Sequence, residues 1–112
     1  MVETAVKESA VRSGVCQVFV PHTTAGVTIN ENADPSVRED ILNGLEKLAP
    51  YGAGYSHAEG NADAHIKSTI VGSDKIIFIE DGRLQFGTWQ GIYFCEFDGP
   101  RQRRVFIKIK EG

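Results

Sequence analysis

The chain has 112 residues, enough for one domain with a single hydrophobic core and too few for two. Apolar residues make up 41% and charged residues 24% of it, which excludes a disordered or collagen-like chain. Fifteen acidic and twelve basic residues leave a net charge of -3, with no cationic excess to attract nucleic acid or an anionic membrane. We therefore expect one compact domain over residues 1–112, with neither nucleic acid nor membrane as partner.

Apolar runs long enough to cross a membrane, roughly 18 residues, are absent from the sequence, and the opening residues are too polar for a signal peptide. We expect a cytoplasmic protein. Cys16 and Cys95 lie far apart, each inside an apolar run, which fits neither a disulfide framework nor a cysteine metal site. Two buried, reduced thiols are expected.

A ragged apolar stripe predicts a first helix over residues 2–12, and Gly14 would end it. The β-branched and aromatic run at residues 15–20 predicts a buried strand. A loop over residues 22–26 and a short second strand over residues 27–30 follow.

Asp34 and Pro35 predict the start of a second helix, because aspartate caps helices and proline suits the first helical position. This helix should continue to Pro50. Its predicted apolar face consists of Val37, Ile41, Leu42, Leu45 and Leu48. Residues 50–61 form a glycine-rich stretch without apolar periodicity, so they predict a loop long enough to suggest a function.

Asn61 can cap a third helix that runs through Ile70 and ends at Gly72. Three further strands are predicted over residues 75–80, 92–97 and 104–109. Helices do not alternate with strands, as a parallel sheet would require. The sequence therefore predicts an α+β fold with a mainly antiparallel sheet, curled or sandwiched, and two or three helices.

The three histidines, His22, His57 and His65, each lie in or beside a predicted loop. Three neutral imidazoles and an open water position make a reactive zinc-type centre. Their spacing does not match the helical pair of a metalloprotease, so on spacing alone surface or capping histidines are the simpler interpretation.

Polar residues crowd the same segments. Asn30, Glu59 and Asn61 can orient ligating imidazoles or hold a hard cation, and Glu59 can act as a general base beside a metal-bound water. The alternative is that asparagines and aspartates here cap helices, which we prefer for Asp34.

Hydroxyls and cations suggest an anion site. Thr23 and Thr24 can present hydroxyls to an anion, although the lysine and spacing of a P-loop are missing. Arg101 and Lys67 are candidate cationic partners for a phosphate.

Three other residues have simpler interpretations. Arg103 and Arg104 are expected to solvate the end of a strand, and Trp89 to sit in the core or line a pocket. No Ser-His-Asp elbow, dinucleotide fingerprint or cysteine metal cluster is present in the sequence.

Three long stretches, from about Gly14 to the end of the chain, resemble the YjbQ family of secondary thiamine-phosphate synthases. They are PHTTAGVTINENADPSV (21–37), YSHAEGNADAHIKSTIVGS (55–73) and GRLQFGTWQGIYFCEFDGPRQRRVFIKI (82–109). The resemblance implies a small α+β domain with a sandwich-like sheet, assembled as a homotrimer. Family members usually have a further strand before the first helix, so we expect this chain to lack it.

The resemblance also implies a weak transferase activity, in which a thiazole phosphate and a pyrimidine diphosphate give thiamine phosphate and diphosphate. The implied metal ligands are His22, His57 and His65. We expect zinc, with magnesium as the alternative because the substrate is a diphosphate. Glu59 and Arg101 are the candidate catalytic residues. The candidate substrate-binding residues are Thr23, Thr24, Asn30, Asn61, Lys67 and Gln90.

A second hypothesis is a metal- or metabolite-binding trimer without catalysis, since the sequence contains no recognisable nucleophile or P-loop.

Overall fold

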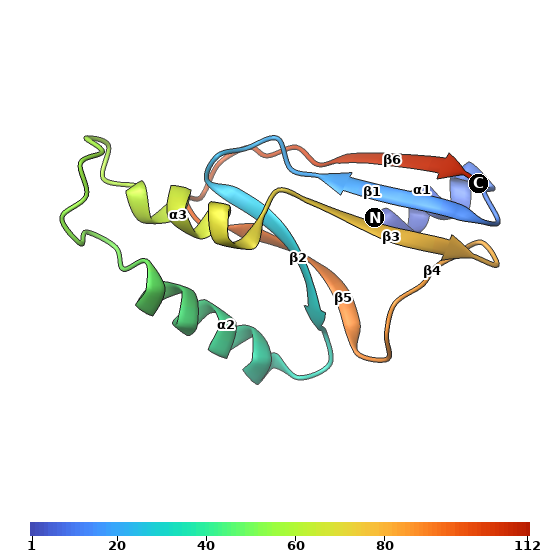
Figure 1. Cartoon of the computed structure of the whole chain (residues 1–112), viewed down its shortest axis with the longest axis horizontal. Helices are drawn as coiled ribbons and strands as arrows, with labels where there is room; N and C mark the ends of the chain where they lie inside the picture. The colour runs from blue at the N-terminus through green and yellow to red at the C-terminus, as the bar shows by residue number, and fades with distance from the viewer.

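The computed structural model describes residues 1–112, which form three helices and six strands. The helices are α1 (Val2–Ser9), α2 (Pro35–Leu48) and α3 (Ala62–Val71). The strands are β1 (Gly14–Phe19), β2 (Ala25–Glu31), β3 (Asp74–Glu80), β4 (Arg83–Leu84), β5 (Gln90–Glu96) and β6 (Phe106–Glu111). A four-stranded sheet has the order β4-β3-β1-β6, and β2 pairs with β5 (Figure 1). Every pairing is antiparallel, so the predicted α+β class is confirmed.

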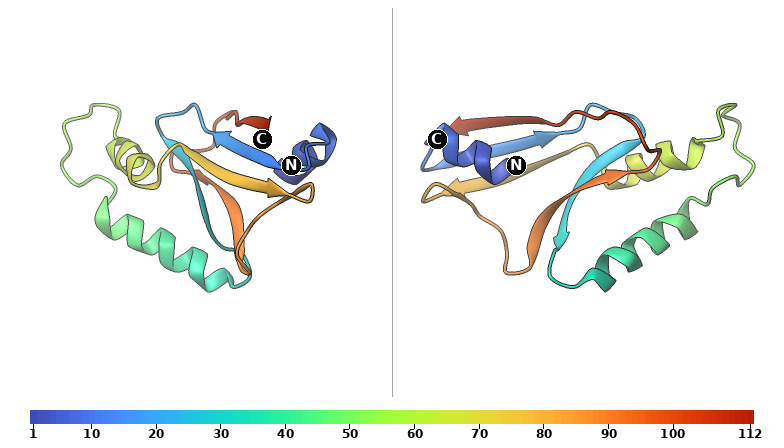
Figure 2. Two further views of the ribbon diagram at one scale, coloured as in Figure 1. Left: turned by 45° about the vertical axis from the view of Figure 1, so that its right-hand side comes forward. Right: turned by 180° about the vertical axis from the view of Figure 1, so that it is seen from behind.

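The core lies between the four-stranded sheet, β2 and α1. Side chains alternate along β1, so Cys16 and Val18 point inward while Gln17 does not. Ile79 of β3 is completely buried on the same side, and Val6 of α1 belongs to the same core. Helix α1 lies beside the four-stranded sheet (Figure 2). The eight core residues are Val6, Cys16, Val18, Val20, Ala25, Val27, Ile77 and Ile79.

The opposite face of the four-stranded sheet is open, and exposed apolar side chains lie among polar ones on it. Ile76 and Phe78 of β3 are exposed there, with 66% of Phe78 accessible, and Phe106 of β6 lies opposite Phe19 of β1. The rings of Phe19 and Phe106 lie 6.3 Å apart, centroid to centroid. An exposed apolar face of this kind is typical of an interaction surface.

The first helix ends earlier than predicted. Ser9 is its last residue, and Ala10 follows with the left-handed φ of 59°. Gly14 belongs to β1 instead of ending the helix. A Cβ atom at Gly14 would lie 2.1 Å from the carbonyl oxygen of Lys110, so only glycine allows β6 to approach this closely.

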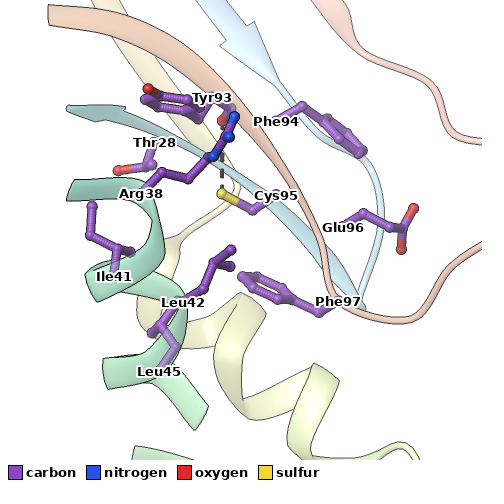
Figure 3. A pocket seen from close by; sticks show the side chains of 10 residues that line it. All are labelled: Thr28, Arg38, Ile41, Leu42, Leu45, Tyr93, Phe94, Cys95, Glu96 and Phe97. Carbon is purple, nitrogen blue, oxygen red and sulfur yellow. Dashed lines mark hydrogen bonds between the residues drawn. The ribbon is translucent and has the colours of Figure 1, made fainter. Parts of the chain in front are cut away.

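The start of α2 agrees with the prediction, because the Asp34 carboxylate accepts a hydrogen bond of 2.9 Å from the Ser36 amide. Part of its apolar face is not covered, however. Leu45 is buried, whereas Leu42 is exposed and Leu48 is 72% accessible. Figure 3 shows the gap between α2 and β5, a pocket of about 220 Å³. Its lining residues are Thr28, Arg38, Ile41, Leu42, Leu45, Tyr93, Phe94, Cys95, Glu96 and Phe97.

Two further predictions need correction. Trp89 lies in the turn before β5 and is 62% exposed, so it is not a core residue. Both cysteines are free, as expected, but only Cys16 is fully buried, whereas Cys95 is partly accessible. Burial raises the pKa of both thiols, which keeps them protonated. None of the three helices has the length and apolar character needed to cross a membrane.

Candidate functional site

The three histidines come from separate segments and line one polar hollow of about 410 Å³. His22 lies between β1 and β2, His57 in the loop between α2 and α3, and His65 in α3. The other lining residues are Pro21, Thr23, Thr24, Glu59, Asn61, Asp98, Arg101 and Arg103. The structure thus brings together most of the residues that the sequence singled out.

The rings of His57 and His65 meet edge to face, with centroids 5.2 Å apart and an interplanar angle of 78°. His22 is fixed differently, because its Nε2 accepts a hydrogen bond of 2.8 Å from the backbone amide of Arg104. A neutral imidazole that accepts at Nε2 carries its proton on Nδ1. In this arrangement His22 can donate a proton toward a ligand, but it has no free nitrogen lone pair.

The residue types of the hollow suit zinc or a related ion, since three imidazoles stand beside the Glu59 carboxylate. The arrangement does not yet form a coordination set. No group of three or more histidine, cysteine, aspartate and glutamate side chains is placed so that it could hold a metal ion. His22 would have to exchange its hydrogen bond with Arg104 for the ion. Metal binding by His22, His57 and His65 stays a prediction.

Arg103 organises one wall of the hollow. Its side chain is only 11% exposed and forms a bidentate ion pair with Glu96, with 2.7 Å from Nε to Oε1. Its Nη2 also donates to the Thr24 hydroxyl at 2.9 Å. The bond from Arg103 lowers the pKa of Glu96, and the same bond raises the pKa of Arg103. The expectation that Arg103 merely solvates a strand end is therefore wrong.

Arg101 and Asn61 meet at Asp98. Arg101 donates from Nη2 to Asp98 Oδ2 at 3.0 Å and from Nε to the Asp98 carbonyl at 2.9 Å. Asn61 donates from Nδ2 to the same Oδ2 at 2.8 Å, and this bond is the main reason that the pKa of Asp98 is lowered. The side chain of Asn61 does not cap α3, which corrects the prediction. Its Oδ1 is buried without a hydrogen-bond partner.

Lys67 does not line the hollow. Its ammonium nitrogen is buried between the carboxylates of Asp63 and Glu46, at 2.9 and 2.7 Å. Burial alone would lower the pKa of Lys67, but these two partners raise it. A cation that is already paired twice is a poor candidate for binding phosphate, so the suggested role of Lys67 lacks structural support.

Asn30 and Gln90 also lie elsewhere. They sit at the far end of the β2–β5 ladder from Ala25, about 17 Å along the strand. Asn30 accepts from the amide of Glu31, and Gln90 accepts from the amide of Gly87. Both side chains make local hydrogen bonds and lie outside the histidine hollow.

Gly26 fixes the position of the His22 loop against α3. A Cβ atom at Gly26 would lie 2.6 Å from the Gly72 carbonyl oxygen, which accepts a 3.1 Å hydrogen bond from the Val27 amide. Only glycine allows this approach, so Gly26 serves packing between β2 and the end of α3.

A second polar hollow of about 370 Å³ adjoins the first and shares His22, Thr23 and His65 with it. Its other lining residues are Ala25, Ser68, Thr69, Gly72 and Ser73. The two hollows together form a site with two compartments and a common wall of imidazoles.

The family model described as UPF0047 protein YjbQ-like matches residues 1–112. The chain belongs to this family. UPF0047 protein MJ1081 of Methanocaldococcus jannaschii is 57% identical over 106 residues, which cover 95% of this chain and 77% of the relative. UPF0047 protein YugU of Bacillus subtilis is 50% identical over 109 residues, which cover 96% of this chain and 83% of the relative.

Solved structures of YjbQ-like proteins share the fold. An uncharacterised member from Clostridium acetobutylicum superposes with a TM-score of 0.95 at 60% identity, over 97% of this chain and 84% of that one. A YbjQ-like protein of unknown function from Sulfolobus solfataricus gives 0.94 at 33% identity, over 99% of this chain and 82% of that one.

Sequence reasoning missed Arg103, Ser68 and Thr69. The helical spacing from His65 could have identified the last two, because residues three and four positions later lie on the same face of a helix. Nothing in the sequence distinguishes Arg103 from Arg104, since the role of Arg103 depends on Glu96 and Thr24, which are distant along the chain.

Proposed function

We propose that this protein is a metal-assisted transferase with weak thiamine-phosphate synthase activity. It would join a thiazole phosphate to a pyrimidine diphosphate and release diphosphate. One observation carries this proposal: three histidines from three segments line a single polar hollow together with Arg101 and Arg103. Such a hollow has the cationic and imidazole donors that a departing diphosphate needs.

The residues of the chain have distinct roles in this proposal. Arg101 neutralises the diphosphate as the bond between carbon and oxygen breaks and the leaving group takes the electron pair. The hydroxyl of Thr23 donates a hydrogen bond to a phosphate oxygen. Asn61 orients a ring through its unpartnered Oδ1. The thiazole nitrogen forms the new bond to carbon, so the chain supplies no nucleophile.

The proposal includes a divalent ion, zinc or magnesium, that would be held by His22, His57 and His65 with Glu59 beside them. Such an ion would supply positive charge next to the diphosphate. The three imidazoles and Glu59 in one hollow support this assignment by their chemistry.

The direct test supplies purified protein with both substrates and measures thiamine phosphate. We expect slow formation by the wild type and at least a hundredfold less with His57→Ala. The control Glu39→Ala, at an exposed position on α2 outside the hollow, should keep the wild-type rate. Product formation equal in His57→Ala, wild type and a protein-free blank would reject the proposal.

We also propose that the protein assembles as a homotrimer in the cytoplasm. The exposed apolar face formed by Phe19, Ile76, Phe78 and Phe106 supports association, because water contact with such a face is unfavourable. Light scattering at micromolar concentration should give a mass three times the chain mass of 12.3 kDa. A mass equal to a single chain would exclude the trimer.

A second candidate is a metal- or metabolite-binding protein without catalysis. The double hydrogen bond from Arg101 to Asp98 favours it, because a guanidinium that is already paired neutralises a leaving group less well. The two candidates differ in one measurement. If the protein binds diphosphate but yields no detectable thiamine phosphate with either metal, the second candidate holds.

A further inference from the structure

The second hollow differs from the histidine hollow in its chemistry. Beyond the shared His22, Thr23 and His65, its wall contains no ionisable side chain and is formed mainly by Ser68, Thr69 and the turn after α3. The arginines and carboxylates all belong to the histidine hollow. A ligand that spans both hollows would therefore have one charged and one uncharged part.

The hydroxyls of Ser68 and Thr69 are already committed as donors. Ser68 donates to the Ala64 carbonyl at 2.8 Å, and Thr69 donates to the His65 carbonyl at 2.9 Å. A hydroxyl has one proton and two lone pairs, so each group retains only acceptor capacity toward the hollow. Ser68 is only 8% exposed, so a ligand group that cannot donate to its hydroxyl would leave that oxygen without a partner at a cost in binding free energy.

We propose that the second hollow binds the uncharged heterocyclic part of the substrate and selects a ring that carries an amino group. The amino N–H groups would donate to the Ser68 and Thr69 hydroxyls, while the phosphates occupy the histidine hollow. This inference deepens the proposed function and rests on it for the placement of the charged part.

The shape and rigidity of the second hollow fit this ligand. Its volume of about 370 Å³ lies within the range of small-molecule sites, roughly 300–1,000 Å³. The Thr69 hydroxyl is hydrogen-bonded to the carbonyl of His65. The hydroxyls of Ser68 and Thr69 and the imidazole of His65 therefore lie on consecutive turns of one helix. Their separation is therefore fixed before the ligand binds.

The test compares two small probes by NMR titration of the full chain, 4-aminopyrimidine and 4-methylpyrimidine. They have similar size, but only the first can donate hydrogen bonds. We expect the amino compound to bind roughly tenfold more tightly, as one satisfied hydrogen bond predicts, with amide shifts at Ser68, Thr69 and Gly72. Equal affinity of the two probes, or shifts confined to the α2 pocket, would overturn the proposal without any variant.

Variants test the acceptors themselves. Thr69→Val should reduce the preference for the amino compound to less than twofold and leave the affinity for inorganic diphosphate unchanged. Ile66→Ala, on the same helix and outside both hollows, should preserve the preference. If Thr69→Val keeps the tenfold preference, the assignment fails.

The binding test needs no turnover, so the two proposals can fail separately. Probe discrimination without thiamine phosphate formation would reject the transferase and retain the second hollow. Thiamine phosphate formation with equal binding of both probes would reject only the second hollow.

Discussion

Arg103 and Thr24 are joined by two hydrogen bonds, from the guanidinium Nη2 to the threonine hydroxyl and to its carbonyl oxygen. The neighbouring residue, Arg104, donates its backbone amide to His22. Consecutive residues before β6 therefore hold the loop that follows β1. The position of His22 in the hollow depends on this pair of contacts.

Replacing Arg103 should destabilise the fold. Arg103→Ala leaves Glu96 without its partner and removes the bond to the Thr24 hydroxyl, so we expect a loss of about 2–3 kcal/mol in the free energy of unfolding. Urea unfolding would measure it. The exposed Arg83 is the matched control, and Arg83→Ala should change stability by less than about 0.5 kcal/mol. Equal effects of the two substitutions would contradict the role assigned to Arg103.

Acid should destabilise the protein through Glu96. The bond from Arg103 lowers its pKa below the ordinary value of 4.5, so below that pH the unfolded chain binds the proton more readily than the folded chain. The stabilisation is therefore complete above about pH 5 and is lost as the pH falls toward the lowered pKa of the folded state. Urea unfolding at several pH values should show a shallower acid slope for Glu96→Gln than for the wild type; parallel slopes would be inconsistent with this account.

Zinc binding should disturb the Arg104 amide if His22 is a ligand. An imidazole that binds the ion through Nδ1 keeps its proton on Nε2, and that nitrogen can no longer accept from Arg104. In a two-dimensional NMR spectrum the Arg104 amide signal should shift on zinc addition, whereas the Lys47 amide at the end of α2 should not. An unchanged Arg104 signal with shifts at His57 and His65 would restrict the ligands to those two residues.

Two isoleucines on opposite faces of β3 should lose different amounts of stability on truncation. Ile79→Ala removes a completely buried side chain, and we expect a loss of about 2–5 kcal/mol in the free energy of unfolding. Ile76→Ala, on the exposed face, should cost the isolated chain less than about 1 kcal/mol but weaken the proposed trimer. Unfolding and light scattering on both variants separate the two effects. A trimer that persists unchanged in Ile76→Ala together with Phe78→Ala would place the interface elsewhere.

Local sequence patterns predicted most helices and strands of the fold. β-branched runs form strands, and Asp34-Pro35 starts a helix, through interactions between residues close in sequence. The apolar stripe of α2 was also visible in the sequence. The sequence did not show that much of this stripe faces a pocket instead of a packed core. Trp89 was predicted to lie in the core or line a pocket because glycines flank it, whereas its exposure results from the position of the turn before β5.

The sequence predicted the histidines of the candidate site, but not the contacts that surround them. His22, His57 and His65 stand out by residue type in or beside predicted loops, and the fold brings them to one hollow. Lys67 was predicted to be a phosphate partner because its pairing with Glu46 cannot be seen in the sequence. That pairing depends on contact between two helices. Tertiary contacts of this kind leave no periodic signal in the sequence.

The central claim is that the histidine hollow binds a metal ion together with diphosphate. Anomalous diffraction at the zinc edge, from crystals soaked with zinc and inorganic diphosphate, tests it most directly. The account predicts a zinc peak within about 2.0–2.1 Å of imidazole nitrogens of His22, His57 and His65, with diphosphate beside Arg101. Diphosphate at another surface, or zinc bound only outside this hollow, would contradict it.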